Sequence, residues 1–260
     1  MREKENKALK KPTCRLGRVL RSATLAAALM LAGVTTAEAV VGDTFTTGGV
    51  SYKVIDATHM YVCAMGIDVS NTASTVNIPE KVTNKDEVYT VTQFGGSWEE
   101  DYHVKVIQLP STVTTLNSST ISGNNNLTDF YIPSSVTTIN PSFGSTATHF
   151  PKFHVEGSNF YADENGLLYS ADKTVLYAVP STVALTDGKY TLPEGVTTIY
   201  SEVLAGMSGL TTIGIPASMK YIKSSSFTNA NNRQVKSVEV ASGNTHFTVA
   251  ANGALVKLNH

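Results

Sequence analysis

Apolar residues return along this chain in a fixed order, around short phrases that contain a proline. The phrases are IQLPSTVTTLN from Ile107, FYIPSSVTTIN from Phe130, YTLPEGVTTIY from Tyr190 and IGIPASMKYIK from Ile213. The apolar residue before each proline serves as an anchor, and the four anchors are Leu109, Ile132, Leu192 and Ile215. Leu109 and Ile132 lie 23 residues apart, as do Leu192 and Ile215. A fixed period of this length is typical of a solenoid, in which each repeat forms one coil.

The alternation of apolar and polar residues before each proline predicts a short strand. In TDFYIP, Phe130 and Ile132 are expected on one side of the strand, with Asp129 and Tyr131 on the other. The proline ends this strand, because it cannot donate a hydrogen bond to a ladder. The SSVTTI that follows predicts a second short strand with two inward residues. No such unit can bury its apolar side alone, so stacked coils must share one core.

The repeated pattern L-x-x-[IF]-x-[IL]-P-x-x-[VM]-x-x-I-x-x-x-x-F resembles the BspA-like leucine-rich repeat, a bacterial surface variant with a 23-residue unit. The resemblance runs from about Val76 to the C-terminus. Two further segments resemble that family: NIPEKVTNKDEVYTVTQF, a strand followed by a hairpin, and NGLLYSADKTVLYAVP, a hairpin within an insertion over about 156–188. The Cys that usually follows the Phe is absent from every coil. The resemblance implies a mainly β, leucine-rich-repeat solenoid of short strands over residues 76–260.

Segments outside the regular repeats are expected to close the ends of the solenoid. The run DTFTTGGVSYKVIDATHMYVCAMGI places Gly48-Gly49 between two strand-like stretches, and we expect residues 40–75 to form an N-terminal β-hairpin cap. Residues 239–258 repeat the start of the insertion, and this copy stops at Asn259-His260 before a return strand. Two alternatives stay open there: a one-strand cap that ends the domain, or a truncated chain.

The first 39 residues have the three parts of a secretory signal peptide. Three arginines between residues 15 and 21 precede the apolar run ATLAAALMLAGV, and Ala37 and Ala39 form an A-x-A cleavage site. The run is twelve residues long, which is too short to cross about 30 Å of hydrocarbon. We therefore predict a signal peptide over 1–39 with cleavage after Ala39, a secreted or cell-surface location, and no membrane span in the mature chain.

Removal of residues 1–39 changes the charge balance. The chain has 20 basic and 21 acidic residues, and the first 39 hold eight and three of them, which leaves 12 basic and 18 acidic. Nothing in this acidic remainder resembles the basic stripe of a nucleic-acid-binding protein, so no nucleic-acid partner is expected. Cys63 is then the single cysteine, so an intramolecular disulfide is excluded. Its apolar run MYVCAM predicts a buried, inert thiol.

Several short motifs resemble catalytic or metal-binding signatures. Ser170 and Lys173 fit S-x-x-K, but they lie at a predicted hairpin turn, and the S-D-N and K-T-G companions of that nucleophile are missing. Asp163 begins ADENG, which resembles a calcium loop without the bidentate Glu, so a turn is favoured. His149 and His154 are the closest histidine pair, with no Cys/His cluster around them. We therefore predict no catalytic residue, no metal site and no cofactor.

Outward positions in the middle coils offer the best candidates for ligand contact. Asp129 and Tyr131 alternate with inward residues on one strand, and Lys152 and His154 take the same positions one coil later. Gln108 holds the corresponding outward position one coil earlier. Adjacent coils stack about 4.8 Å apart, so Tyr131 and His154 are expected to be lateral neighbours. Such a mixture of aromatic and charged groups suits contact with a protein or a glycan.

Three functions follow from these observations. The first is a non-catalytic interaction protein, for which the family resemblance implies adhesion and an extracellular protein or glycan partner, including host matrix proteins. The second is a structural module of a larger surface protein. The third is a glycan-active enzyme, which requires two carboxylates about 5–9 Å apart, and no two adjacent coils place such a pair in the outward rows. Trp98, in FGGSWEEDY, is expected to pack on the first coil, and exposure would make its loop a further binding candidate.

Overall fold

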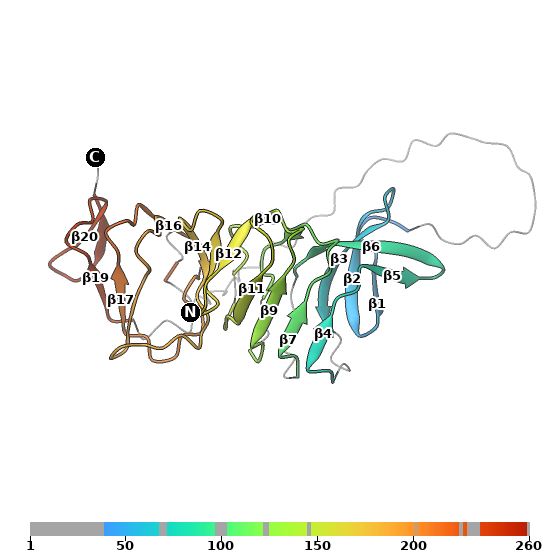
Figure 1. Ribbon diagram of the computed structural model, residues 1–260, viewed down its shortest axis with the longest axis horizontal. Helices are drawn as coiled ribbons and strands as arrows, with labels where there is room; N and C mark the ends of the chain where they lie inside the picture. Colours follow the sequence, from blue (N-terminus) through green and yellow to red (C-terminus); the bar gives the residue numbers. More distant parts are fainter. Residues whose placement is uncertain are drawn as a thin grey trace, which may run out of the picture. The chain divides into compact units, whose positions relative to one another are not determined.

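A computed structural model describes residues 39–67, 72–96, 103–121, 125–144, 147–200, 202–223, 226–227 and 235–258. Every helix or strand assigned within these ranges is a β-strand, which confirms the mainly β fold (Figure 1). The chain divides into two units, Met1–Glu38 and Ala39–His260, and all strands of the described residues belong to the second unit. The predicted signal peptide lies outside the described residues apart from Ala39, and so does Trp98.

The N-terminal cap is an antiparallel meander of three strands, β1 (Thr44–Thr47), β2 (Val50–Asp56) and β3 (Tyr61–Ile67). Gly48 and Gly49 join β1 to β2 with φ values of 58° and 73°. Left-handed conformation at both loop positions defines a type I′ turn, a favoured two-residue hairpin loop, and glycine adopts this conformation without a steric cost. The predicted β-hairpin cap is therefore confirmed, and β3 extends it by a third strand.

Two parallel ladders form the first part of the solenoid, one from each strand of the repeat. The first ladder contains β4 (Thr75–Asn77), β7 (Val106–Gln108), β9 (Asp129–Ile132) and β11 (Lys152–Val155) in that order. The second contains β6 (Glu87–Phe94), β8 (Thr115–Leu116) and β10 (Thr138–Ile139). β3 pairs in parallel with β6, and β5 (Lys81–Asn84) forms the predicted hairpin with β6. The cap thus continues directly into the second ladder.

The two-ladder arrangement continues past β11 in two further, separate sheets. The first is formed by β15 (Lys189–Thr191), β17 (Thr212–Ile215) and β19 (Ser237–Val240), and the second by β14 (Val175–Ala178), β16 (Thr198–Ile199) and β18 (Tyr221–Ile222). The insertion adds β12 (Phe160–Ala162) and β13 (Leu168–Ser170), which precede β14 in an antiparallel sheet. The predicted hairpin is β13–β14, and its second strand also pairs in parallel with β16.

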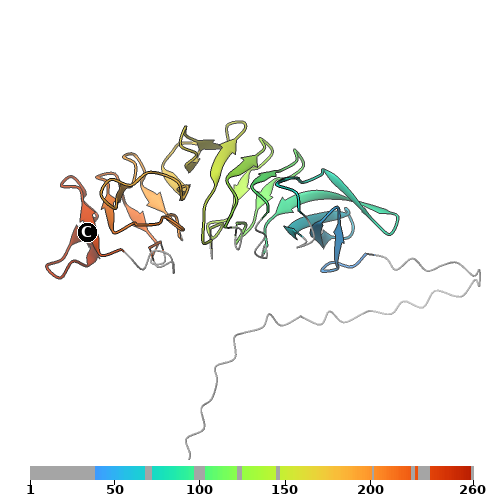
Figure 2. The same ribbon diagram turned by 90° about the horizontal axis from the view of Figure 1, so that it is seen from below.

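The C-terminal strands repeat the start of the insertion. β19 is followed by β20 (Phe247–Val249) and β21 (Leu255–Lys257), which pair antiparallel as β12 and β13 do. The succession from cap to β19–β21 can be followed coil by coil in Figure 2. The predicted correspondence between residues 239–258 and the insertion is thereby confirmed.

The core lies between the two ladders, on the sides of the strands that are predicted to face inward. Phe130 and Ile132 are 0% and 1% exposed, while Tyr131 between them is 37% exposed. Phe130 also contacts Phe94 and Phe153, with ring centroids 5.5 and 6.0 Å apart. Val155 and Val240, which the strand register pairs with Ile132 and Ile215, are only half-buried. They lie on β11 and β19, the last strands of their sheets.

Candidate binding site

The structure brings the five predicted contact residues onto one face of the first ladder. The register pairs Asp129 with Lys152 and Tyr131 with His154, and it also pairs Gln108 with Tyr131. The predicted lateral contact between Tyr131 and His154 is therefore confirmed. We call these five residues the β9–β11 patch, although Gln108 belongs to β7. Their role as ligand contacts stays a prediction.

Specific contacts hold the side chains of the β9–β11 patch in place. The rings of Tyr131 and His154 stack with centroids 4.3 Å apart and planes 11° apart. His154 Nε2 lies 2.7 Å from Asp129 Oδ1, diagonally across the two strands. Thr128 donates its hydroxyl to Asp129 Oδ2 at 2.8 Å. Sequence reasoning missed Thr128, because its hydroxyl reaches the patch from a residue placed just before the strand.

The charge of Asp129 is stabilised by its surroundings. Partial burial acts to raise the pKa of this carboxyl, but hydrogen bonds from His154 and Thr128 outweigh it. The nearby charges of His154 and Lys152 act in the same direction, so the pKa of Asp129 is lowered from its usual value of 3.8. Asp129 is therefore ionised at neutral pH, and it orients His154 on a face that is open to solvent.

A shallow pocket of about 300 Å³ lies beside the patch. Its walls include Gln108 and Tyr131 from the patch, and also Glu156. Sequence reasoning missed Glu156, although one signal was present: it lies 23 residues after Pro133, at the position where the regular coils have a proline. A carboxylate, an amide and a phenol therefore surround a space at the lower limit of small-molecule sites, which measure about 300–1,000 Å³.

The insertion closes the outer edge of β11 next to the patch. Phe153 donates its backbone N–H to the carbonyl oxygen of Gly166 at 3.1 Å. Gly166 has a φ of 81°, and a Cβ at this position would lie 2.8 Å from Cβ of Lys152. Only glycine fits this approach without a shift of the backbone. The turn that contains Gly166 thus satisfies a hydrogen-bonding group that an open sheet edge would expose.

The remaining motifs have structural roles in the described residues. Asp163 Oδ1 accepts the N–H groups of Asn165 and Leu167, so its carboxylate stabilises the predicted turn. Ser170 donates its hydroxyl to Asp172 Oδ1 at 2.6 Å, at a turn and not on a helix. Burial raises the pKa of the Cys63 thiol to about 11, which agrees with the predicted inert thiol. Within the described ranges, no group of three His, Cys, Asp or Glu side chains could hold a metal ion.

The repeat also identifies the family by direct comparison. The profile of the BspA type leucine rich repeat region matches six copies, over residues 70–147 and 185–251. The chain belongs to this family. The interval between the two matched segments coincides with β11 and the insertion, where the repeat is irregular. None of the curated proteins matches the sequence.

Bacterial leucine-rich repeat structures resemble the chain. A leucine-rich repeat protein from Eubacterium ventriosum is 19% identical, with 75% of this chain and 70% of that chain covered and a TM-score of 0.36. A leucine rich cell surface protein from Faecalibacterium prausnitzii is 14% identical, with 78% and 84% covered and a TM-score of 0.35. A protein from Bacteroides ovatus is 16% identical, with 76% and 71% covered and a TM-score of 0.29.

In the part of the chain that the structure describes, no helix is long and apolar enough to cross a membrane.

Proposed function

We propose that this repeat protein acts outside the cytoplasm as a non-catalytic binding protein, and that its β9–β11 patch contacts a partner protein. Export is inferred from the arginines, apolar run and A-x-A site of the first 39 residues. The observation that carries the binding proposal is the ordered group of Asp129, Tyr131 and His154 on an exposed strand face. An adhesive role, with a host matrix protein as partner, is the form of this function that the family resemblance implies.

A protein partner suits the composition of the patch better than a small ligand does. Aromatic rings with few rotatable bonds supply contact area at low entropic cost, and such residues are enriched at the centres of interfaces. Tyr131 is stacked on His154, so these side chains are already ordered in the unbound protein and lose less conformational entropy on binding. The pocket with Glu156 and Gln108 is small enough for one side chain. We expect that side chain to be basic, because the described residues that line the pocket include a carboxylate and no cation.

Binding to a panel of immobilised extracellular matrix proteins tests this proposal. The mature protein should bind one member by interferometry, and replacing Tyr131, Lys152 and His154 together with Ala should weaken binding at least tenfold, an effect of about 1.4 kcal/mol or more. The matched control replaces Lys189, Thr191 and Glu239, which lie on the first ladder after the insertion. Unchanged affinity of the patch variant for a partner that the wild type binds would show that the patch is not the contact surface.

A further inference from the structure

A second hollow lies on a different face of the molecule, where the cap meets the second ladder. It has a volume of about 570 Å³, well within the range of about 300–1,000 Å³ for small-molecule sites. Strands β2, β3 and β6 and the segment before β8 line it. The β9–β11 patch contributes no residue to its walls. We call this space the cap cavity.

Strand pairing explains which side chains face the cap cavity. Tyr61 on β3 is paired with Asp56 on β2 and with Thr90 on β6, so the three side chains come to the same face of the sheet. Thr92 follows two residues after Thr90 and shares that face, while the alternating residue Val91 is fully buried. The outward face of these strands therefore presents a phenol ring, a carboxylate and two hydroxyl groups.

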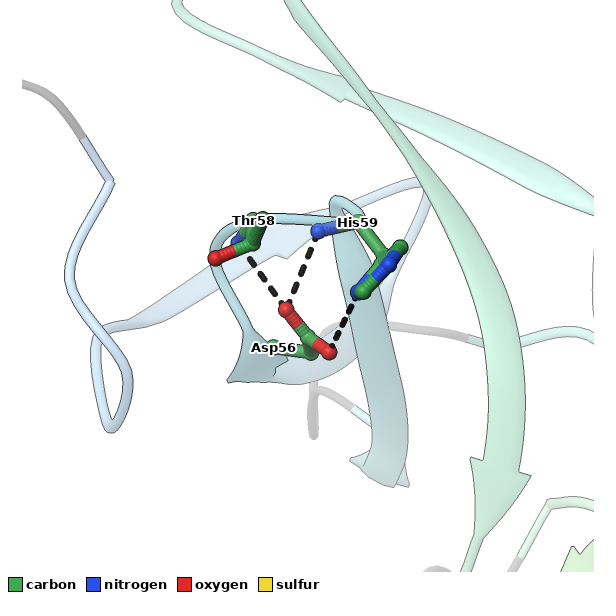
Figure 3. Close-up of polar contacts among 3 residues, drawn as sticks. All are labelled: Asp56, Thr58 and His59. Atoms are coloured by element: carbon green, nitrogen blue, oxygen red, sulfur yellow. Dashed lines mark hydrogen bonds and ion pairs between the residues drawn. The ribbon is translucent and has the colours of Figure 1, made fainter.

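The turn between β2 and β3 holds an aromatic platform beside the cavity. Asp56 Oδ1 accepts the N–H groups of Thr58 at 2.9 Å and His59 at 3.0 Å, and Asp56 Oδ2 lies 2.8 Å from His59 Nδ1 (Figure 3). These contacts fix the imidazole, which stacks on Tyr61 with centroids 5.5 Å apart and planes 23° apart. Tyr61 nonetheless remains 38% exposed. A large ring held in one orientation at the rim of a cavity is suited to a flat ligand face.

The polar groups of the cap cavity are almost all uncharged. Thr114 and Gln93 line it together with Thr90 and Thr92. The Gln93 side-chain oxygen accepts a hydrogen bond from Asn117 at 3.0 Å, so the amide is held in place with its NH₂ as a donor. The hydroxyl of Thr112, also at this wall, is buried without a hydrogen-bond partner among the described residues. Hydroxyl and amide groups can both donate and accept, which matches a ligand rich in hydroxyl groups.

Charge decides which ligands of that kind can bind. Asp56 is the single ionisable side chain other than Tyr61 among the described lining residues, and its carboxylate already accepts three contacts. Hydrogen bonds from the His59 backbone and side chain lower the pKa of Asp56, so it carries a negative charge at neutral pH. Among the described residues that line the cavity, there is no Lys or Arg to offset that charge. Sulfated, phosphorylated or carboxylated ligands would therefore be repelled.

We propose that the cap cavity binds a neutral oligosaccharide. The hydrogen-rich face of a pyranose ring carries partial positive charge and packs on the negative face of Tyr61. The hydroxyls of the sugar then exchange hydrogen bonds with Thr90, Thr92 and Thr114 and with the amide of Gln93. This activity goes beyond protein binding at the β9–β11 patch, and it uses none of the residues of that patch.

Calorimetric titration with neutral hexasaccharides tests the proposal on the mature protein. The panel comprises hexamers of glucose, mannose, xylose, galactose and N-acetylglucosamine, with a heparin hexasaccharide as the anionic probe. At least one neutral hexamer should bind at millimolar concentration or below, and heparin should bind more weakly than that hexamer. Absence of binding by every neutral hexamer, or stronger binding of heparin, would overturn the proposal.

Variants at the rim then locate the site. Replacing Tyr61 with Ala should weaken binding about tenfold through loss of the stacked ring, and Tyr61→Phe should stay within about threefold. His59→Ala should weaken binding about threefold. This variant replaces Tyr61→Ala as the test if Tyr61→Ala does not fold. The matched control is Tyr221→Ala, which removes another tyrosine that is 46% exposed. If His59→Ala and Tyr61→Ala both bind the sugar with wild-type affinity, the proposal is overturned. The triple Ala variant of the β9–β11 patch should bind the sugar with wild-type affinity.

Discussion

Replacing Ile132 with Ala tests the register of the whole solenoid. Ile132 is 1% exposed on β9 and is paired with Val155 on the next coil. The change removes three carbons, which at about 0.8 kcal/mol each amounts to about 2.4 kcal/mol of lost transfer free energy. The cavity that remains adds about 1–2 kcal/mol, because packed neighbours relax only in part. We therefore expect the free energy of unfolding to fall by about 3.4–4.4 kcal/mol.

The adjacent residue supplies the comparison. Tyr131→Ala removes a larger side chain from the same strand, but that side chain is 37% exposed and its main contact is the ring of His154. We expect a loss of about 1 kcal/mol, the usual size of an aromatic pair. Ile132→Val, which keeps most of the buried volume, should cost about 0.5–1.5 kcal/mol.

Urea denaturation followed by circular dichroism measures all three variants. With an m-value of about 2–3 kcal/mol per molar, Ile132→Ala should lower the midpoint by about 1–2 M, and Tyr131→Ala by about 0.3–0.5 M. The m-values should stay equal, since a change in m would indicate a partly unfolded coil. Equal midpoints for the two Ala variants would show that the strand is displaced by one residue, because such a shift exchanges the inward and outward sets.

Three further predictions concern other parts of the chain. The folded-state pKa of Asp129 is lowered, so the ionised carboxyl stabilises the fold above its unfolded pKa of about 3.8, and this stabilisation is lost as pH falls through the folded-state pKa. Asp129→Asn should therefore flatten the loss of urea resistance below pH 4. An unchanged pH profile of the variant would contradict this. Gly166→Ala should destabilise the fold by more than about 1 kcal/mol, since the new Cβ would meet Lys152. Gly195 has a φ of 92°, and a Cβ there would meet no described atom within 4 Å, so Gly195→Ala should cost only the backbone strain. Equal costs of the two variants would exclude the steric explanation. Protein sequencing of the exported form should begin at Val40, and retention of residues 1–39 would refute the predicted signal peptide.

Much of the fold and part of the candidate site could be predicted from the sequence. The 23-residue spacing of the anchors assigns equivalent positions in successive coils, and the alternation within each strand assigns the inward side. Together they are sufficient to place Tyr131 beside His154, as the observed register does. The Gly48-Gly49 pair between two strand-like stretches separately predicted a hairpin, because this pair of residues matches the turn that such a loop requires.

Tertiary structure alone decided the contacts that depend on side-chain conformation or on segments outside the regular repeats. The diagonal contact of His154 with Asp129 requires one particular orientation of each side chain, which the strand period does not specify. The cap cavity joins Asp56, Tyr61 and Thr90 from three strands, with register shifts between β2 and β3 and between β3 and β6. No repeat relates these strands, so only their pairing could bring the three residues together. A sequence period determines neighbours where coils repeat, and long-range packing determines them elsewhere.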